Sequence, residues 1–472
     1  MDTQCNPTQL EFHALDRREV VGKFDGGTIT SDAGGLLLRE VEKRTEIIGR
    51  FAKCFDDLRD PDLIEHTVAE LVGQRVYGLA LGYEDLNDHD ELRSDPLLAV
   101  LVGKEDPEGG SRLRKRDHGK AMAGKSTLNR LELTPAEPSD SDRRYKKIIM
   151  KPEEIDRLFV DIFLQAQVEV PKQIILDVDA TDDPLHGDQE GRFFHGYYMN
   201  YCYLPLYIFC GEHLLCARLR PSNIDASEGT LEELERIIDQ IRSVWPEVEI
   251  IIRGDCDFSR ETIMSWCEAH AVDYVFGFAK NQRLKAIIAE ELVQAQQLYE
   301  ETKTAARVFK DFRYQTLQSW SRERRVVAKA EYLDKGANPR FIVTSIETKE
   351  MDARSLYEQL YCGRGDMENR IKEQQLWLFA DRTSAGKMRA NQLRLYFSSA
   401  AYLLMQALRR LGLRGTQMAT AQCHTIRLKL LKIGAQVKIT VRKVWVSLAG
   451  GYPYREIFHQ VYRNLQAEVL RC

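Results

Sequence analysis

Three carboxylates stand where they could act on one substrate. Asp179 ends the apolar run IILDVDA, Asp255 ends the apolar run IIIRGD, and Glu368 lies in the helix-like stretch YCGRGDMENRIKE. A short apolar run indicates a buried strand, and functional groups in open α/β sheets gather at the carboxyl ends of strands. Two adjacent central strands would therefore bring Asp179 and Asp255 close together.

Carboxylates this close favour a metal site. They repel each other, and the pKa of one rises unless a cation lies nearby. Mg²⁺ prefers oxygen ligands and keeps several waters, so two or three carboxylates suffice to hold it. Two such ions about 3.5–4 Å apart stabilise both the attacking and the leaving oxygen of phosphoryl transfer. The acids predict a site for two Mg²⁺ ions, with Mn²⁺ as an alternative. The competing interpretation is two turn aspartates that only cap the elements that follow.

The third acid shares its helix with other polar residues. Tyr361, Arg364, Glu368 and Lys372 recur at spacings of three, four and four residues, which places them on one face of an α-helix. Arg364 could hold the Glu368 carboxylate or a phosphate in a fork, and Lys372 could reach a DNA backbone. An ordinary exposed helix with ion pairs four residues apart has the same pattern.

The elements that must position these acids alternate between strands and helices from residue 151 onward. Strand-like runs lie at 172–181, 200–220 (with a turn at Gly211–Glu212), 247–258 and 272–280; helical runs lie at 151–168, 227–245 (with Ser227 as a plausible cap), 260–271, 355–379 and 390–412. Residues 283–353 break the alternation with three strand-like runs, which predicts an inserted β-rich unit.

The amino-terminal third predicts a mostly helical region with a basic arm. Residues 104–126 are polar, glycine-rich and basic, so we expect a loop that lies on DNA, with a disordered surface loop as the alternative. The expected contacts are Arg112, Arg114, Lys115, Arg116 and Lys125. Gly119–Ser126 also satisfies the nucleotide-binding pattern GxxxxGK[ST], but SRLRKRDH before it cannot be a buried strand, so no nucleotide is expected.

Composition indicates a soluble protein with unevenly placed charge. The chain has 472 residues and a net charge of -5, yet residues 394–472 hold 13 lysines and arginines against two acids, a net charge of +11. This asymmetry suggests a polyanionic partner, although a solvated helix end would look the same. No apolar run is long enough for a membrane span, and no secretory signal is visible, so a cytoplasmic location is expected. Cys202, Cys210 and Cys216 are expected to be buried.

Three motifs carry a family resemblance. DVDATDD, RGDCDF and YCGRGDMEN resemble the acidic motifs of DDE transposases with an RNase H-like catalytic core. The insertion-sequence 1380 family, a relative of the insertion-sequence 4 group, is most similar. FDGGTITSDAGGLLLRE, RPSNIDA and DRTSAGKMRANQLRLYF also resemble it, so the similarity covers most of the chain.

The resemblance selects the site residues. Its first acid precedes an x-Thr pair, which favours Asp179 over the neighbouring acids Asp177, Asp182, Asp183 and Asp188. Its second precedes x-Asp/Gly-Phe, which matches Asp255. Its third belongs to a Tyr, Arg, Glu, Lys signature. Tyr361, Arg364 and Glu368 match that signature, but Gln375 stands at the lysine position, and Lys372 lies one helical turn earlier.

The implied function is DNA transposition. Asp179, Asp255 and Glu368 would hold two Mg²⁺ ions, and water or a DNA 3′-hydroxyl would attack the phosphodiester at the terminal inverted repeats and in target DNA. Tyr361, Arg364 and Lys372 would position the backbone, and His186 is either a DNA contact or a turn residue. The resemblance also implies a homodimer that pairs the two ends, associated with the bacterial nucleoid. A silent DNA-binding regulator and a structure-specific nuclease remain alternatives.

These expectations define an α/β fold class. An RNase H-like core would span 151–282 and 354–410, interrupted by the β-rich insertion at 283–353. A mostly helical DNA-binding region would precede it at 1–150, and a basic tail would follow at 411–472.

Overall fold

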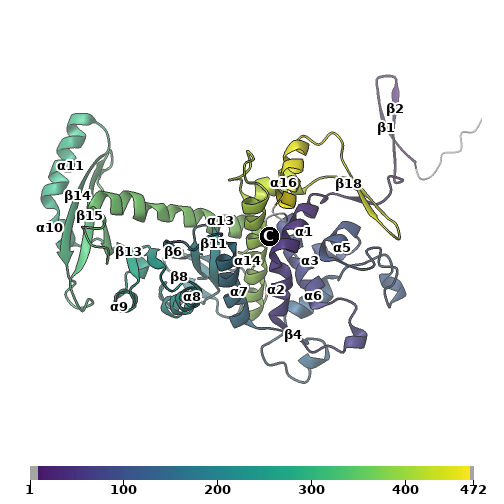
Figure 1. Ribbon diagram of the computed structural model, residues 1–472, viewed down its shortest axis with the longest axis horizontal. Helices are drawn as coiled ribbons and strands as arrows, with labels where there is room; N and C mark the ends of the chain where they lie inside the picture. Colours follow the sequence, from purple (N-terminus) through teal and green to yellow (C-terminus); the bar gives the residue numbers. More distant parts are fainter. Residues whose placement is uncertain (1–8, 468–472) are drawn as a thin grey trace, which may run out of the picture. The chain divides into compact units, whose positions relative to one another are not determined.

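The computed structural model describes residues 9–467, which divide into two compact units (Figure 1). Unit 1 comprises residues 9–53, 57–131 and 407–467; unit 2 comprises residues 54–56 and 132–406. Among the described residues, no helix is long and apolar enough to cross a membrane.

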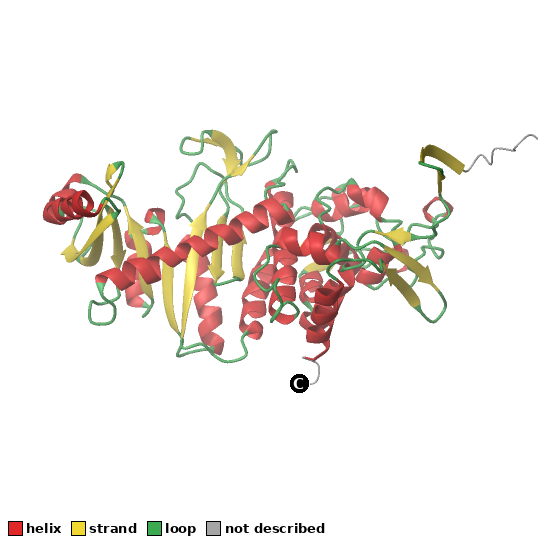
Figure 2. Cartoon of the chain, turned by 90° about the horizontal axis from the view of Figure 1, so that it is seen from above, coloured by secondary structure: helices red, strands yellow, loops and turns green. Residues whose placement is uncertain are grey.

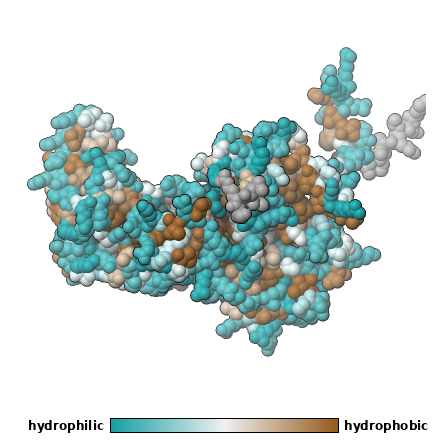
Figure 3. Space-filling model, in the orientation of Figure 1, coloured by the Kyte–Doolittle hydropathy of each residue, from teal (hydrophilic) through white to brown (hydrophobic). Residues whose placement is uncertain are grey.

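Unit 1 is helical, with small sheets at its edge. Its principal helices are α1 (Gly35–Thr45), α2 (Ile47–Lys53), α3 (Val68–Leu81), α4 (Asp88–Leu92), α5 (Pro96–Val102), α6 (Lys125–Glu132, whose last residue is in unit 2), α15 (Cys423–Ile426) and α16 (Arg455–Ala467). Its strands are β1 (Gln9–Leu15), β2 (Arg18–Lys23), β3 (Ile29–Thr30), β18 (Ala435–Ile439) and β19 (Val444–Leu448). The hairpin β1–β2 carries exposed hydrophobic side chains (Figure 3).

Local sequence explains where these helices begin and end. Thr67 and Glu70 form a reciprocal capping box at the start of α3, and Gly82 ends it in the left-handed conformation at φ 98°. Residues 35–53 form two helices and not one, because Glu46 adopts φ 51° and ends α1. The Glu42 carboxylate then accepts hydrogen bonds from the first amides of α2.

The carboxyl-terminal segment completes unit 1. β18 pairs with β3, and the backbone amides of Ala33 and Gly34 donate to carbonyls of residues 433 and 431 at 3.1 Å. Lys432 forms an ion pair with Asp32 at 2.6 Å, and the Arg427 guanidinium donates to helix α3 carbonyls. Part of the positive charge counted in this segment therefore serves the fold.

Unit 2 is built on a nine-stranded sheet. The strand order is β11-β10-β6-β12-β13-β17-β15-β14, with β16 beside β15. β6, β12 and β13 run parallel to one another, and the other neighbours are antiparallel. The strands are β6 (Gln173–Ala180), β10 (Leu206–Cys210), β11 (His213–Arg218), β12 (Glu249–Gly254), β13 (Asp273–Phe278), β14 (Ala306–Tyr314), β15 (Arg324–Leu333), β16 (Gly336–Ala337) and β17 (Arg340–Thr344).

The segment 283–353 extends this sheet. It begins with helices α10 (Gln282–Ile287) and α11 (Ala289–Thr302). The three expected strand runs are β14, β15 and β17, but β17 pairs directly with β13, so the runs lengthen the core sheet and form no separate sheet. Figure 2 shows the strands of unit 2 with helices packed against them.

Helices cover both faces of the sheet. On one face, apolar residues of α7 (Pro152–Ala166), α8 (Thr230–Val244) and α9 (Glu261–Ala269) pack in a common core with alternate strand residues. On the other, Leu356, Tyr357 and Leu360 pack against Ile251 and its neighbours. This makes β12 a central strand that is buried on both sides, as its continuous apolar run predicts.

One local expectation is wrong, and a second is confirmed only in part. Ser227 does not cap α8: Gly229, at φ 72°, occupies that position, and the Ser227 hydroxyl donates to Asp225 instead. The helix expected over 355–379 is not uniform, because a wide π-helical turn spans Leu356–Tyr361 and a 3₁₀ turn spans Cys362–Arg364 before α13 (Gly365–Leu378) begins. Helix α14 follows and runs Met388–Leu411.

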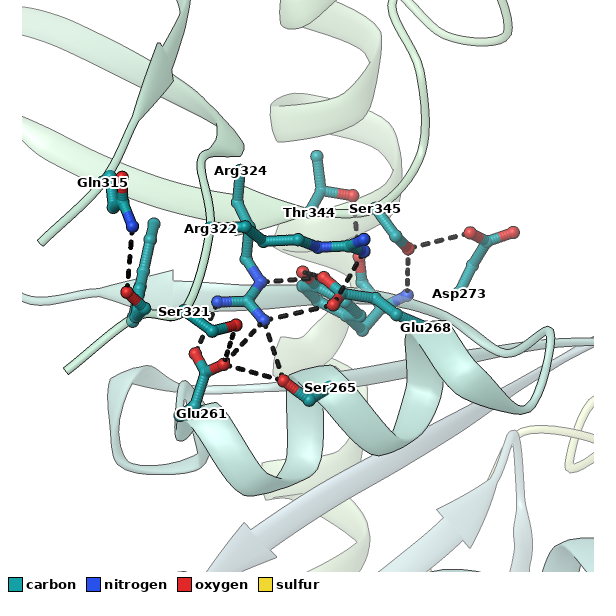
Figure 4. A network of polar contacts seen from close by, with 12 residues as sticks. Glu261, Ser265, Glu268, Asp273, Gln315, Ser321, Arg322, Arg324, Thr344 and Ser345 are labelled. Atoms are coloured by element: carbon teal, nitrogen blue, oxygen red, sulfur yellow. Dashed lines mark hydrogen bonds and ion pairs between the residues drawn. The ribbon is translucent and has the colours of Figure 1, made fainter.

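A buried ion network fastens β15 to α9 (Figure 4). The Arg324 side chain is 2% exposed and contacts Glu261 at 2.6 Å and Glu268 at 2.7 Å. The Tyr274 hydroxyl also donates to Glu268. A guanidinium buried this deeply requires these partners, so the network ties an added strand to the core.

Candidate active site

The register of two strands aligns the first two acids. β6 and β12 are parallel neighbours, with Arg253 opposite Asp177. Side chains alternate along a strand, so Asp177 and Asp179 share a face with Arg253 and Asp255. Continued by two residues, the same register places Asp255 beside Asp179 at the carboxyl end of the sheet.

Asp177 is committed to structure. Both of its carboxylate oxygens accept from Arg253, at 2.5 and 2.8 Å, and Arg253 also donates to the Leu360 carbonyl. All of these groups are buried, so this ion pair holds the two strands and the π-helical turn together. Arg253 is a residue that the sequence analysis missed. Its signal was a charged residue inside an apolar run, two positions before Asp255.

Arg364 joins the first and third acids. Its guanidinium donates to Asp179 at 3.2 Å and to Glu368, four residues further along the helix, at 2.7 Å. The side chain is 19% exposed, so the ion pair is partly shielded from solvent. The structure thus brings together three residues that the sequence had placed on two separate elements.

Electrostatics mark these acids as a crowded site. Burial raises the pKa of Asp179, Arg364 lowers it, and the charges of Asp255 and Glu368 raise it, so that the pKa is about 7. Burial also raises the pKa of Asp255, although the Asp257 amide donates to its carboxylate. The charges of the other two acids therefore both act on Asp179.

The donor set suits a divalent cation. In residues 9–467, no three histidine, cysteine, aspartate or glutamate side chains are gathered as a ready-made metal site. Yet all three candidates offer hard carboxylate oxygens, and Arg364 supplies only one positive charge for three negative ones. A cation that prefers oxygen would neutralise the remainder, so Asp179, Asp255 and Glu368 fit Mg²⁺ or Mn²⁺ by their chemistry.

Tyr361 lies close to the second acid. A Cβ atom added to Gly277 would lie 2.7 Å from the Tyr361 hydroxyl oxygen and 2.9 Å from the Cys256 amide nitrogen. Only glycine at position 277 allows this approach. The neighbouring Asp255 charge also raises the pKa of Tyr361, after burial.

The position expected to hold lysine faces the first acid's loop. The Gln375 side-chain amide donates to the Asp182 carbonyl at 3.1 Å, so position 375 supports the chain just after Asp179. Lys372 is exposed.

The other nearby acids have their own partners. Asp182 accepts from Asn200 at 3.1 Å, and Asp183 is buried against the Thr383 hydroxyl at 3.0 Å with its pKa raised by burial to about 8. Asp188 forms an exposed ion pair with Arg192. His186 is exposed on the same loop.

The basic arm in unit 1 divides into buried and exposed cations. Arg112 pairs with Glu65 at 3.3 Å and donates to the carbonyls of Lys120 and Met122, so it stabilises its own loop. Arg114, Lys115 and Arg116 are exposed on a short 3₁₀ turn. That turn, and no strand, precedes Gly119–Ser126, so the setting of a nucleotide-binding loop is missing.

The exposed Lys125 is tied to neighbouring polar groups. It contacts Asp90 at 3.4 Å and donates to Asn87.

Among the cysteines, Cys202 and Cys216 are buried as expected, while Cys210 is partly exposed.

Known proteins bear on this site. The chain matches the family model of the transposase DDE domain group 1 over residues 12–470. No curated protein shows significant sequence similarity to it. Among solved structures it is similar to a piggyBac transposase synaptic complex with hairpin DNA determined by cryo-EM. The identity is 12%, the match covers 85% of this chain and 80% of that chain, and the TM-score is 0.39. A score this low does not establish a shared fold.

Proposed function

Because the chain belongs to the transposase DDE domain group 1 family, we propose that it is a DNA transposase that cuts element ends and joins them to target DNA through Asp179, Asp255 and Glu368. The single observation that carries this assignment is the Arg364 guanidinium bound to both Asp179 and Glu368. It links carboxylates from a central strand and from a helix at the end of the sheet where Asp255 also lies.

The strand order supports an RNase H-like core. An antiparallel hairpin, β10–β11, lies on one side of β6, and the parallel strands β12 and β13 lie on the other. The first acid is then on the first strand, the second follows the fourth, and the third is on a helix that returns after the insertion. Membership of the insertion-sequence 1380 family is the finer assignment that we propose from the motifs.

The mechanism assigns a role to each residue. Asp179, Asp255 and Glu368 would hold two Mg²⁺ ions, which when bound supply Lewis-acid stabilisation of the attacking and leaving oxygens. Asp179 must lose its proton to act as a ligand. Arg364 keeps two of the carboxylates together and offers a fork to the scissile phosphate.

Two further residues fix the site's surroundings. Tyr361 presents its hydroxyl beside the turn that carries Asp255. Gln375 holds the loop that follows Asp179 through the Asp182 carbonyl. Both would therefore position the acids and the DNA strand without taking up or giving a proton themselves.

DNA contacts are proposed beyond the acids. Lys372 and His186 in unit 2, and Arg114, Lys115, Arg116 and Lys125 in unit 1, are exposed and would contact backbone phosphates. We also propose a homodimer that pairs two element ends.

Cleavage of end DNA tests the function. Duplexes from the regions that flank the coding sequence are incubated with protein and Mg²⁺, and the products are resolved by length. We expect Mg²⁺-dependent cuts at a terminal repeat and joining of the 3′ ends to a target plasmid. Asp179→Ala, Asp255→Ala and Glu368→Ala should each abolish cutting and leave end binding intact.

Each alternative predicts a different product pattern. Binding without Mg²⁺-dependent cutting would identify a DNA-binding regulator. Cutting without transfer of 3′ ends would identify a nuclease. Cutting that survives in one of the three alanine variants would remove that residue from the site.

A further inference from the structure

An aromatic hairpin follows the first acid of the proposed site. Strands β8 (Phe193–His195) and β9 (Asn200–Tyr203) pair as a hairpin, and β7 (Asp183–Pro184) pairs with β9. Strand β8 is labelled in Figure 1. The turn between β8 and β9 is Gly196-Tyr-Tyr-Met199, in which Met199 adopts φ 54°.

The base of the hairpin is firmly held. The Tyr203 hydroxyl donates to the Glu190 carbonyl at 2.6 Å, and the Ser222 hydroxyl donates to the Phe193 carbonyl at 2.9 Å. The Asn200 amide donates to Asp182, and the Glu190 amide donates to the Gly386 carbonyl. The outer residues of the hairpin are thus presented from an anchored base.

One face of the hairpin exposes two aromatic rings beside the half-buried Arg192, which also pairs with Asp188 at 3.1 Å. Phe194 and Tyr201 are paired across the strands, with ring centroids 5.4 Å apart, and the Arg192 guanidinium lies 3.9 Å from the centre of the Tyr201 ring. Phe194 is 52% exposed, Tyr201 is 46% exposed and Tyr197, in the turn, is 83% exposed. Leaving this much ring surface in water is unfavourable, which suggests a ligand.

The hairpin reaches the proposed acid site. After burial, the charges of Asp182, Asp179 and Asp255 each raise the pKa of Tyr198. Tyr198 also contacts His195 and Tyr197, with ring centroids 4.9 and 5.0 Å apart. The Asn200 amide of the hairpin also donates to Asp182, three residues after Asp179, at 3.1 Å. A ligand in the acid site would therefore lie near the aromatic hairpin.

We propose that the hairpin is a stacking surface for unpaired nucleobases of the DNA strand whose phosphodiester enters the acid site. Aromatic faces stack on any base, and an adjacent guanidinium adds attraction to the base or to its phosphate. Bases inside a duplex are stacked on each other, so the surface would select locally single-stranded DNA. This inference rests on the proposed function, because it takes the DNA strand as the ligand of the acids.

Single-strand binding tests the surface directly. The probe is a fluorescein-labelled oligothymidine of 12 nucleotides, with a 12-base-pair duplex for comparison, measured by anisotropy without metal. The variant combines Phe194→Ala, Tyr197→Ala and Tyr201→Ala in the full chain. Because the variant loses three rings on which bases would stack, we expect affinity for oligothymidine to fall at least about tenfold and duplex affinity to change less than about twofold.

A matched control exists in the same unit. Tyr145 is also an exposed tyrosine with an arginine near its ring, at 5.1 Å from Arg144. Tyr145→Ala should leave both affinities unchanged, and thermal unfolding should show that the triple variant is folded. If the triple variant melts below the assay temperature, Tyr197→Ala alone, in the open turn, replaces it, with an expected loss of about threefold or more.

The outcomes separate this inference from the proposed function. Unchanged oligothymidine binding in the folded variant, with Mg²⁺-dependent cutting by the wild type, overturns the stacking surface and leaves the function standing. If the variant binds oligothymidine more weakly but the wild type never cuts DNA, the stacking surface is supported and the proposed transposase function is contradicted. A variant that changes only the oligomeric state identifies a protein contact and overturns the proposal, as does a wild type that binds no oligothymidine.

Discussion

At the scale of single residues, the central feature is one guanidinium among three carboxylates. Arg364 bonds to Asp179 and Glu368 and lowers the pKa of Asp255. Burial makes each negative charge costly, because the surrounding protein solvates charge less well than water does. The site therefore depends on positive charge from a side chain, a metal ion or both.

Removing that guanidinium should disable cleavage. We expect Arg364→Gln to reduce the cleavage rate about 100-fold or more, a loss typical of removing a preorganised donor from developing charge. Single-turnover cutting of end DNA measures it. Arg370→Gln, on the same helix and paired with Glu212, is the control, with an expected loss below about threefold. Equal rates for both variants would contradict the role of Arg364.

The raised pKa of Asp179 predicts a pH-dependent stability. The pKa of Asp179 is near 3.8 in the unfolded chain and about 7 in the folded protein. Between pH 3.8 and pH 7, Asp179 is therefore protonated in the folded state and ionised in the unfolded state. Stability contributed by Asp179 therefore falls as pH rises through this window. Asp179→Asn should remain neutral and gain roughly 1–3 kcal/mol over the wild type at pH 8.

Thermal unfolding in EDTA from pH 4 to pH 8 measures this effect. The gain should be small at pH 4 and grow toward pH 8. Asp188→Asn, at an exposed acid on the same loop, controls for a change of net charge. Parallel stability curves for wild type and Asp179→Asn would show that Asp179 ionises normally.

At the scale of elements, the site depends on how closely a strand and a helical turn approach. Tyr361 packs over Gly277 of β13, and Arg253 of β12 reaches the Leu360 carbonyl. The π-helical turn at Leu356–Tyr361 sets the rotation of the helix that follows. With this rotation Leu360 packs into the core while Arg364 contacts Asp179. Sheet and helix therefore position the acids jointly.

A methyl group at position 277 should disturb this approach. Gly277→Ala would place its Cβ 2.7 Å from the Tyr361 oxygen and 2.9 Å from the Cys256 nitrogen. We expect a folded protein that cuts DNA about tenfold more slowly and is about 1–3 kcal/mol less stable. Chemical denaturation checks the stability. Adding Tyr361→Phe to Gly277→Ala removes the crowded hydroxyl and should restore part of the lost stability. If no stability is recovered, the strain arises from the contact with Cys256 alone.

The ion network on β15 should dominate the stability of the added strands. Arg324→Leu leaves Glu261 and Glu268 without their buried partner and should cost about 3–5 kcal/mol. Arg322→Leu removes a mostly exposed cation that also contacts Glu268, and should cost below about 1 kcal/mol. Denaturant unfolding compares the two. Similar losses would mean that burial of Arg324 does not matter.

At the scale of the whole molecule, unit 1 is assembled from segments far apart in the sequence. Residues near Ala33 bond to the chain near Ile433, and Arg427 bonds to carbonyls of α3. These contacts close a loop of several hundred residues, so the last part of the chain must be present before unit 1 is complete.

Truncation tests this dependence. A chain ending at residue 411 should lose β18, the Lys432–Asp32 ion pair and the Arg427 contacts, leaving buried groups of α1 and α3 exposed. We expect rapid proteolysis between residues 9 and 131, while residues 132–406 stay resistant. A control that ends at residue 449 keeps those contacts. Equal resistance of the two truncated chains would show that the terminal segment is dispensable.

The sequence alone determined most elements and the candidate acids. Apolar runs place β6, β12 and β13 correctly, because a strand buried on both faces admits few polar residues. The acids at their ends and the Arg364–Glu368 spacing follow from local chain geometry. The resemblance to a transposase family agrees with the family match over residues 12–470.

Only the tertiary structure decided how these parts combine. In the folded chain Asp177 pairs with Arg253, and Asp179 pairs with Arg364. The strands of 283–353 join the core sheet. Residues 427–437 become part of unit 1. Each of these outcomes depends on which distant groups meet and how much water they exclude. Neighbouring residues cannot encode that, because burial and partner choice are properties of the packed chain.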